Sequence, residues 1–205
     1  MKIRGAKLVI VFLALAGFPL VTQATSVTPP EFVQLVQESD YVVLALVKSV
    51  TAENKAPPGR RPVIYSHVEL DVKQVVAGEP PSPLVLKVLG GKLGDQEMHI
   101  SGTPKFTVGE EAIFFVQGNG TQIYPLVRMM HGLYPVLHDP ATGKEFVARS
   151  NGEPMSDVAE VQQPMHGARR VAAGEPGQAT ASALSPEEFI TRIRATAKEI
   201  RGREK

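Results

Sequence analysis

Residues 41–50 read Tyr41-Val42-Val43-Leu44-Ala45-Leu46-Val47-Lys48-Ser49-Val50, a nearly unbroken run of β-branched and apolar side chains. Such residues favour strands, because their side chains pack well on a pleated surface. A run without alternation indicates a strand that is covered on both faces. Residues 41–50 therefore predict a central strand whose first half is buried on both faces.

A second long strand is expected over residues 63–76, where apolar and polar side chains alternate. The apolar residues at even-numbered positions are Ile64, Val68, Leu70 and Val72. The odd-numbered positions carry Tyr65, His67, Glu69, Asp71 and Lys73. Successive side chains of a strand point to opposite faces, so this pattern predicts a long, bent and half-buried strand. The polar segment 51–62, rich in Pro, Gly and Arg, is expected to be an exposed loop.

Shorter apolar runs predict the remaining strands. They are Leu84–Leu89, Glu111–Gln117, Gln122–Arg128, Leu133–Leu137 and Lys144–Arg149. The turn at residues 118–121 is a hairpin signal, and residues 92–106 show so little periodicity that they are expected to be a long connection. Five or more antiparallel strands at this spacing predict a mainly β fold built on a small barrel.

Helices are expected before the first strand and at the end of the chain. Thr28 is the expected cap of the first helix, with Pro29 at its first position and Glu31 completing a capping box. The second helix occupies 185–205, and its cap, first residue and capping-box partner are Ser185, Pro186 and Glu188. Its narrow apolar stripe is Phe189, Ile193, Ala197 and Ile200. This amphipathic helix could dock on the barrel, lie on an anionic surface or engage a partner.

The first 24 residues have the layout of a secretory signal peptide. Lys2, Arg4 and Lys7 precede an apolar run over 8–21, and small residues close the segment at 22–24. That run is 14 residues long, whereas a spanning helix needs roughly 20. An uncleaved anchor is the alternative. The pattern predicts an exported protein, periplasmic or extracellular, without a stable membrane span after cleavage.

Composition excludes several chemistries. The chain has no cysteine, which rules out thiol catalysis, Cys-ligated metals and disulfides. Cleavage after residue 24 would remove three of the 22 basic residues and leave 19 against 21 acidic ones, a net charge of −2. A near-neutral exported protein is not expected to attract nucleic acid.

The stretch between the last predicted strand and the last helix differs in composition. Between residues 147 and 188 there is no aromatic residue, and Gly, Pro, Ala, Gln and Ser are abundant. Such a segment buries little apolar surface, so a flexible linker is expected over 151–184. The predicted organisation is a signal peptide at 1–24, a barrel domain at 25–150, this linker, and the helix at 185–205.

Three segments resemble the netrin-like OB-fold modules, a group that includes the tissue inhibitors of metalloproteinases. The segments are Ser39–Val47 (SDYVVLALV), Val68–Gly78 (VELDVKQVVAG) and Val108–Val116 (VGEEAIFFV). A group of exported bacterial proteins of unknown function shows the same layout, over about Pro29–Arg149. The resemblance implies an OB-like antiparallel barrel that acts on another exported protein, with a protease as one candidate. The animal inhibitors chelate zinc through an N-terminal cysteine, and that mechanism does not carry over to a chain without cysteine.

No catalytic, metal or cofactor site is predicted. The five histidines His67, His99, His131, His138 and His166 form neither an HExxH motif nor a His-x-x-x-His pair. Ser101 lacks the Gly-x-Ser-x-Gly elbow, and the segment 90–94 lacks the Gly-Lys-Ser/Thr ending of a phosphate loop.

A mixed basic and aromatic cluster is the best candidate for contact with a partner. Its members are Arg128, Met129, Met130, His131 and Tyr134. OB-like barrels bind ligands on strand faces and loops. The sequence thus predicts a non-catalytic binding or accessory module. Its alternatives are an exported hydrolase with a dispersed active site, or a polysaccharide-binding domain, which the absence of tryptophan disfavours.

Overall fold

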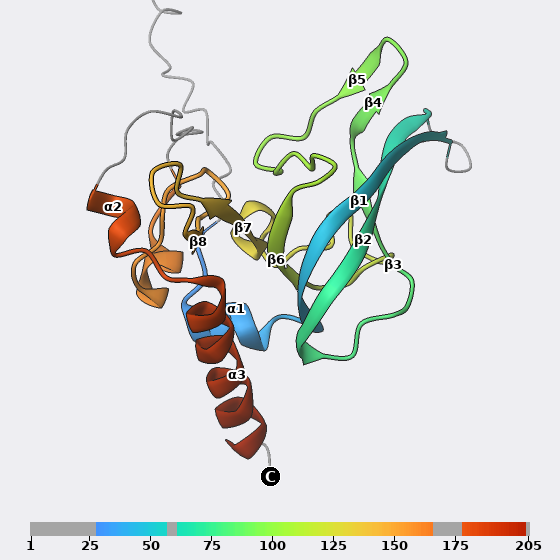
Figure 1. Cartoon of the computed structure of the whole chain (residues 1–205). Coiled ribbons are helices and arrows are strands. Elements are labelled where there is room, and N and C mark those ends of the chain that lie inside the picture. The colour runs from blue at the N-terminus through green and yellow to red at the C-terminus, as the bar shows by residue number, and fades with distance from the viewer. Residues whose placement is uncertain (1–27, 57–60, 166–177, 204–205) are drawn as a thin grey trace, which may run out of the picture.

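A computed structural model describes residues 28–56, 61–165 and 178–203, and the predicted signal peptide at 1–24 lies outside these residues. Six strands form one antiparallel sheet in the order β3-β2-β1-β6-β7-β8, and β4 and β5 form a separate hairpin (Figure 1). The strands are β1 (Tyr41–Lys55), β2 (Val63–Gly78), β3 (Leu84–Leu89), β4 (Gly91–Leu93), β5 (Gln96–Met98), β6 (Glu111–Val116), β7 (Leu133–His138) and β8 (Glu145–Val147). The helical elements are α1 (Phe32–Gln37), η1 (Met129–Gly132), η2 (Val158–Gln162), α2 (Gln178–Ala181) and α3 (Pro186–Arg203). The predicted mainly β fold with a helix at each end is confirmed.

Strand β1 lies in the middle of the sheet, as its apolar run predicts. It pairs with β2 along its length and with β6 through residues 41–46. Two cores lie on the two faces of this sheet. The inner core includes Val43, Ala45, Val68, Leu86, Phe114 and Leu126. The outer core, between the sheet and the helices, includes Val42, Ile113, Phe115, Tyr134, Phe189 and Ile193.

The described strands do not close into a barrel by pairing with one another, because β3 and β8 end the sheet. An irregular segment, residues 123–127, bridges β3 and β6 instead. Leu89 N–H donates to the Ile123 carbonyl oxygen (3.0 Å), and Val127 N–H donates to that of Phe115 (3.0 Å). Pro125, which has no N–H to give to a ladder, accounts for the irregularity of a segment predicted as a strand. The inner core is thereby enclosed by backbone on the β3 side.

Helix α1 begins later than the sequence predicted. Its cap is Glu31, whose N–H donates to the Gln34 side-chain oxygen (3.1 Å), and Thr28 does not cap it. The reason is the Pro29-Pro30 pair: a residue that precedes proline is pushed out of the helical region, so Pro29 cannot start a helix. The short helix remains, shifted to the residues after Pro30.

Residues 151–165 belong to the folded body, which corrects the prediction of a flexible linker over that part of 151–184. Met155 and Val161 are fully buried in the outer core. Arg149 is buried too, and it donates to Glu153 (3.1 Å) and to the Gln163 carbonyl oxygen. A few buried apolar residues are thus enough to hold in the fold a segment whose composition is typical of a flexible linker. Residues 166–177 lie outside the described residues.

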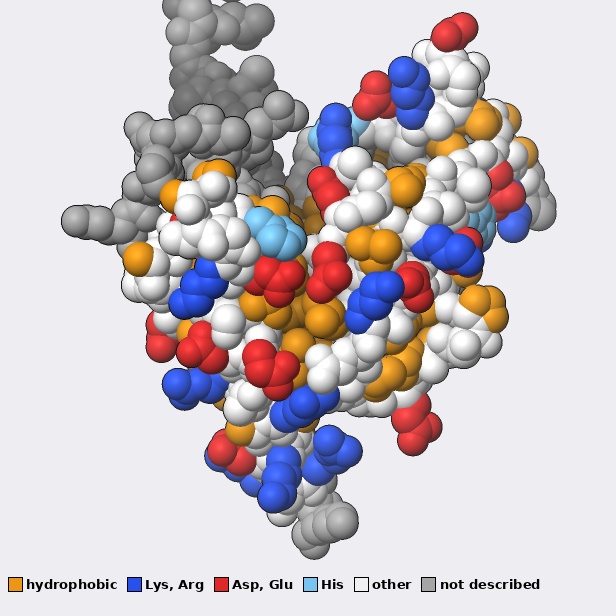
Figure 2. Space-filling view, in the orientation of Figure 1, with side chains coloured by type: hydrophobic (Ala, Val, Ile, Leu, Met, Phe, Trp, Pro, Cys, Tyr) orange, Lys and Arg blue, Asp and Glu red, His pale blue; other side chains and the backbone are white. Residues whose placement is uncertain are grey.

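Helix α3 docks on the body and is not a separate unit. The capping box is confirmed, because Ser185 N–H donates to the Glu188 carboxylate (2.8 Å) and Glu188 N–H donates to the Ser185 hydroxyl oxygen (3.3 Å). Phe189, Ile193 and Ala197 are buried in the outer core. On the face shown in Figure 2, basic side chains gather at the lower end of the molecule, where α3 ends.

None of the helices among the described residues is both long and apolar enough to cross a membrane.

Candidate partner-binding site

The residues predicted to contact a partner have different environments in the structure. Arg128 is held by Glu38, through Nε to Oε2 (3.1 Å) and Nη2 to Oε1 (2.6 Å). Its backbone has a left-handed φ of 47°, which turns the chain into η1. The ion pair between Arg128 and Glu38 joins the end of α1 to the end of the 123–127 segment, so Arg128 has a structural role in the fold.

The other members of that cluster offer little surface. Met129 and Met130 are half-buried, and Met129 packs against the inner core. His131 and Tyr134 are only 3% and 2% exposed. Tyr134 lies in the outer core, where burial raises the pKa of its phenol and the nearby Arg149 lowers it. A partner therefore cannot reach His131 or Tyr134 in this conformation.

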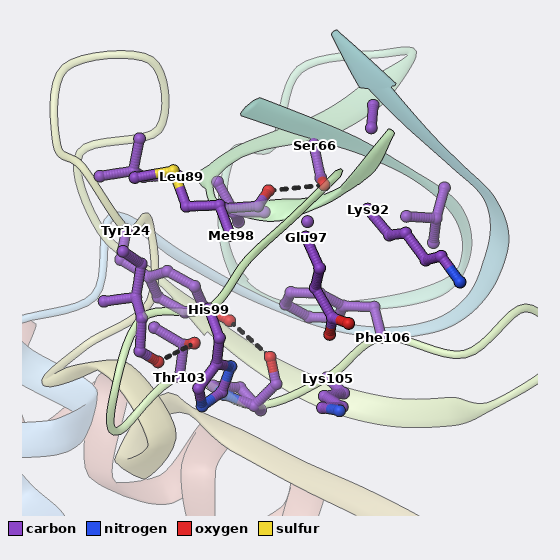
Figure 3. Close-up of a pocket in the computed structure, with 17 residues that line it drawn as sticks. Ser66, Leu89, Lys92, Glu97, Met98, His99, Thr103, Lys105, Phe106 and Tyr124 are labelled. Carbon is purple, nitrogen blue, oxygen red and sulfur yellow. Dashed lines mark hydrogen bonds between the residues drawn. The ribbon is translucent and has the colours of Figure 1, made fainter. Parts of the chain in front are cut away.

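A pocket of about 270 Å³ lies elsewhere, at the end of the sheet where the β4–β5 hairpin projects. Figure 3 shows the side chains around it. The lining comes from the far half of β1, the end of β3, the β4–β5 hairpin, the loop 99–106 and Tyr124. These segments are distant in sequence, and only the fold brings them together.

Two glycines let the chain form one wall of this pocket. Gly90 and Gly91 both have positive φ, at 99° and 133°, which glycine adopts at little cost. A Cβ on Gly91 would lie 2.0 Å from the Ser66 hydroxyl oxygen. That hydroxyl donates to the Gly90 carbonyl oxygen (2.8 Å). The close approach of β2 to this turn fixes where β4 leaves β3.

The loop 99–106 forms the opposite wall and is anchored to the body. The Thr103 hydroxyl donates to the Ile100 carbonyl oxygen (2.7 Å), and the Tyr124 hydroxyl donates to that of Pro104 (3.2 Å). The Phe106 ring stacks on Phe114 and on Tyr124, with centroids 6.4 and 6.3 Å apart. Burial raises the pKa of Tyr124 above its ordinary value of 10.0, so its hydroxyl stays protonated as a hydrogen-bond donor even in alkaline solution.

The pocket combines an apolar interior with a mostly basic rim. Lys92, His99 and Lys105 are exposed there, with Glu97 as the acidic member. Lys92 and Lys105 form no ion pair with another described residue. Val50, which is 38% exposed, contributes apolar surface. This arrangement suits a ligand that carries a carboxylate beside an apolar group.

The described residues offer no assembled catalytic group in the pocket. No hydrogen bond joins His99 to a serine, a threonine or a carboxylate in the described part of the chain, although a nucleophile needs such a base within reach. Within the same residues, no three His, Asp or Glu side chains gather as metal ligands would.

Sequence reasoning missed this pocket because its walls come from the segment read as a structureless connection. A local signal is the Gly90-Gly91 pair, which directly follows the predicted strand Leu84–Leu89. No protein-family model matches the chain, and no curated protein matches its sequence. The geometry of the pocket is therefore the basis for assigning a site there.

Proposed function

We propose that this protein is a non-catalytic binding module that acts on another exported protein and takes a segment of that protein into the pocket. The observation that carries the proposal is the pocket itself, where Lys92 and Lys105 have no ionic partner among the described residues and stand beside half-buried Met98, Ile100 and Phe106. Cations next to accessible apolar surface favour a segment with acidic and apolar side chains over a purely polar ligand.

The aromatic rings argue against the polysaccharide alternative. Sugar binding uses open aromatic faces, but Phe106 is stacked against Phe114 and Tyr124 within the protein. Tyr124 is only 6% exposed, and the chain has no tryptophan. The pocket therefore lacks an open platform on which a pyranose ring could stack.

Two features of the sequence support the proposed location of the protein and the proposed class of its ligand. The signal-like segment 1–24 supports export, so the partner would be met in the periplasm or outside the cell. The resemblance to netrin-like OB-fold modules supports a protein as the ligand, with an exported protease as one candidate. Because the chain has no cysteine, a protease would have to be bound without the metal-chelating cysteine of the animal inhibitors.

Site-specific photo-cross-linking in the source cells tests the proposal. A benzoylphenylalanine replaces Lys105 at the pocket in one full-length variant, and Lys73 on β2 in a matched control. Lys73 is also an exposed lysine, paired with Asp71 (2.5 Å) and absent from the pocket lining. We expect a discrete protein adduct from position 105 alone. Absence of an adduct at 105, or the same adducts at both positions, would contradict the proposal.

A further inference from the structure

The outer edge of β1 changes character half-way along the strand. Val47 is the last residue paired on the β6 side: its N–H donates to the Glu110 carbonyl oxygen (2.9 Å), and its carbonyl oxygen accepts from Gly109 N–H (2.9 Å). Beyond that point β1 continues to Lys55 and pairs with β2 alone among the described residues. The far half of β1 is therefore an edge strand.

The register identifies the backbone groups on that edge. Gly90 N–H donates to the Ile64 carbonyl oxygen (2.8 Å), so the even-numbered residues in this part of β2 direct their backbone towards β3 and the odd-numbered ones towards β1. Thr51 pairs with His67, and Glu53 pairs with Tyr65. Backbone groups alternate in direction along a strand, so those of residues 50, 52 and 54 point away from β2.

The ends of the sheet are covered, in contrast to this edge. Along β3, the Asn119 side chain donates to the Val85 carbonyl oxygen (2.8 Å) and accepts from Lys87 N–H (3.2 Å). Along β8, Val147 accepts from Met155 N–H (3.0 Å) and donates to the Leu184 carbonyl oxygen (2.8 Å). Natural proteins usually protect an edge that must not pair with another chain. Among the described residues, β4 packs close to β1, but no hydrogen bond caps the outward backbone groups of the far half of β1.

This uncovered edge borders the pocket, because Val50 and Ala52 are both pocket-lining residues. The same two residues thus present outward backbone groups and side chains that line the pocket. We infer that the partner binds by adding an extended segment as a further strand on β1 at residues 50–54, with an acidic side chain placed towards Lys92 and Lys105. This binding mode rests on the proposed function and specifies how the pocket is used.

The charges near this edge favour an acidic segment. Glu53 is paired with His67 (2.9 Å) and Glu69 with Lys48 (2.6 Å), so these two acids on β1 and β2 already have basic partners. Among the described residues that line the pocket, Lys92, Lys105 and His99 face a single acid, Glu97. A segment that alternates acidic and apolar residues would place one kind of side chain near the lysines, since side chains of a strand alternate in direction.

The test uses a synthetic peptide, acetyl-Val-Glu-Val-Glu-Val-amide, titrated into the full chain and followed by NMR. Two further peptides carry N-methyl groups on alternate amides, one in each phase. We expect slower amide hydrogen exchange at Val50 and Ala52 on binding. One of the methylated peptides should bind about tenfold more weakly, the effect of losing roughly one good hydrogen bond.

Variants separate strand addition from simple filling of the pocket. Ala52→Pro removes an outward N–H without taking one from the β1–β2 ladder, and proline is tolerated on an edge in that orientation. Ala52→Ser keeps the N–H and is the matched control. We expect about a tenfold loss of peptide affinity for Ala52→Pro and little change for Ala52→Ser.

The outcomes distinguish the two proposals. Equal affinity for all three peptides, together with a loss of binding in Lys92→Glu/Lys105→Glu, would overturn strand addition and leave the pocket as the site. If Ala52→Pro fails to fold, the methylated peptides still decide the matter on the natural chain. Failure of the peptide to bind would overturn the inference about the ligand, and the cross-linking experiment would then judge the proposed function separately.

Discussion

Tyr134 on β7 and Phe189 on α3 pack ring against ring, with centroids 5.1 Å apart and ring planes inclined by 56°. Phe189 also lies 6.1 Å from the Phe115 ring and 5.8 Å from that of Phe32. The C-terminal helix thereby joins α1, β6 and β7 in the outer core. Its removal would uncover that core rather than release an appendage.

Truncation of Phe189 should therefore destabilise the whole protein. We expect Phe189→Ala to lower the free energy of unfolding by about 3–5 kcal/mol, the usual cost of deleting a buried phenylalanine ring. Urea denaturation followed by circular dichroism measures this value, and Arg192→Ala, on the exposed side of α3, is the control. A loss below about 1 kcal/mol would show that α3 is not part of the core.

Asn119 should protect the outer edge of β3. Its side chain both donates to and accepts from that strand, so Asn119→Ala leaves two backbone groups without their partner. We expect a loss of about 1–2 kcal/mol in stability and faster hydrogen exchange at Lys87. Gln122→Ala, at an exposed position of the same turn, is the control. Unchanged exchange at Lys87 would refute this role.

Arg128 should matter for stability and not for partner binding. Its pair with Glu38 is about one-third exposed on each side, and such pairs are worth about 0.2–1 kcal/mol. We expect Arg128→Ala to cost about that much in thermal or urea unfolding, with no further loss when Glu38→Gln is added. A large fall in partner affinity in Arg128→Ala would instead support the partner contact that the sequence predicts for this residue.

Asp139 should make stability depend on pH in the acid range. Hydrogen bonds from the Thr180 hydroxyl, and then from the Ala141 and Thr142 N–H groups, lower the pKa of its carboxyl below the ordinary 3.8. A lowered folded pKa means that the stabilisation is present above the unfolded pKa and is lost as pH falls through the folded value.

The comparison of wild type with Asp139→Asn isolates this effect from the other carboxyl groups. We expect the variant to melt at a lower temperature near pH 6, and the gap to close below about pH 4. Differential scanning calorimetry at several pH values measures both melting temperatures. A gap that is the same at every pH would show that ionisation of Asp139 does not contribute.

Local patterns predicted the parts of the fold that depend on neighbours in sequence. The run at 41–50, the alternation in β2 and the capping box at Ser185 all form as expected. Burial of Met155 and Val161 could not be predicted, because it depends on contacts with distant elements rather than on local composition. The same holds for Tyr134, whose aromatic and polar character suggested a surface but whose environment is the outer core.

The same limit applies to the prediction of the binding pocket from the sequence. Val50, Ser66, Gly91 and Tyr124 line one cavity, yet no spacing in the sequence brings them together. The rim lysines lie on a hairpin and a loop that have weak periodicity, so their shared location becomes visible only in three dimensions.

The most direct test of the pocket is a charge reversal measured against the partner that cross-links at position 105. Isothermal titration calorimetry compares Lys92→Glu/Lys105→Glu with the control Lys73→Glu/Lys198→Glu, which reverses two exposed lysines away from the pocket. We predict that the pocket variant binds the partner at least about tenfold more weakly, as loss of charge complementarity at an interface requires, while the control binds as the wild type does. Equal affinities for the pocket variant and the wild type would contradict the assignment of this site.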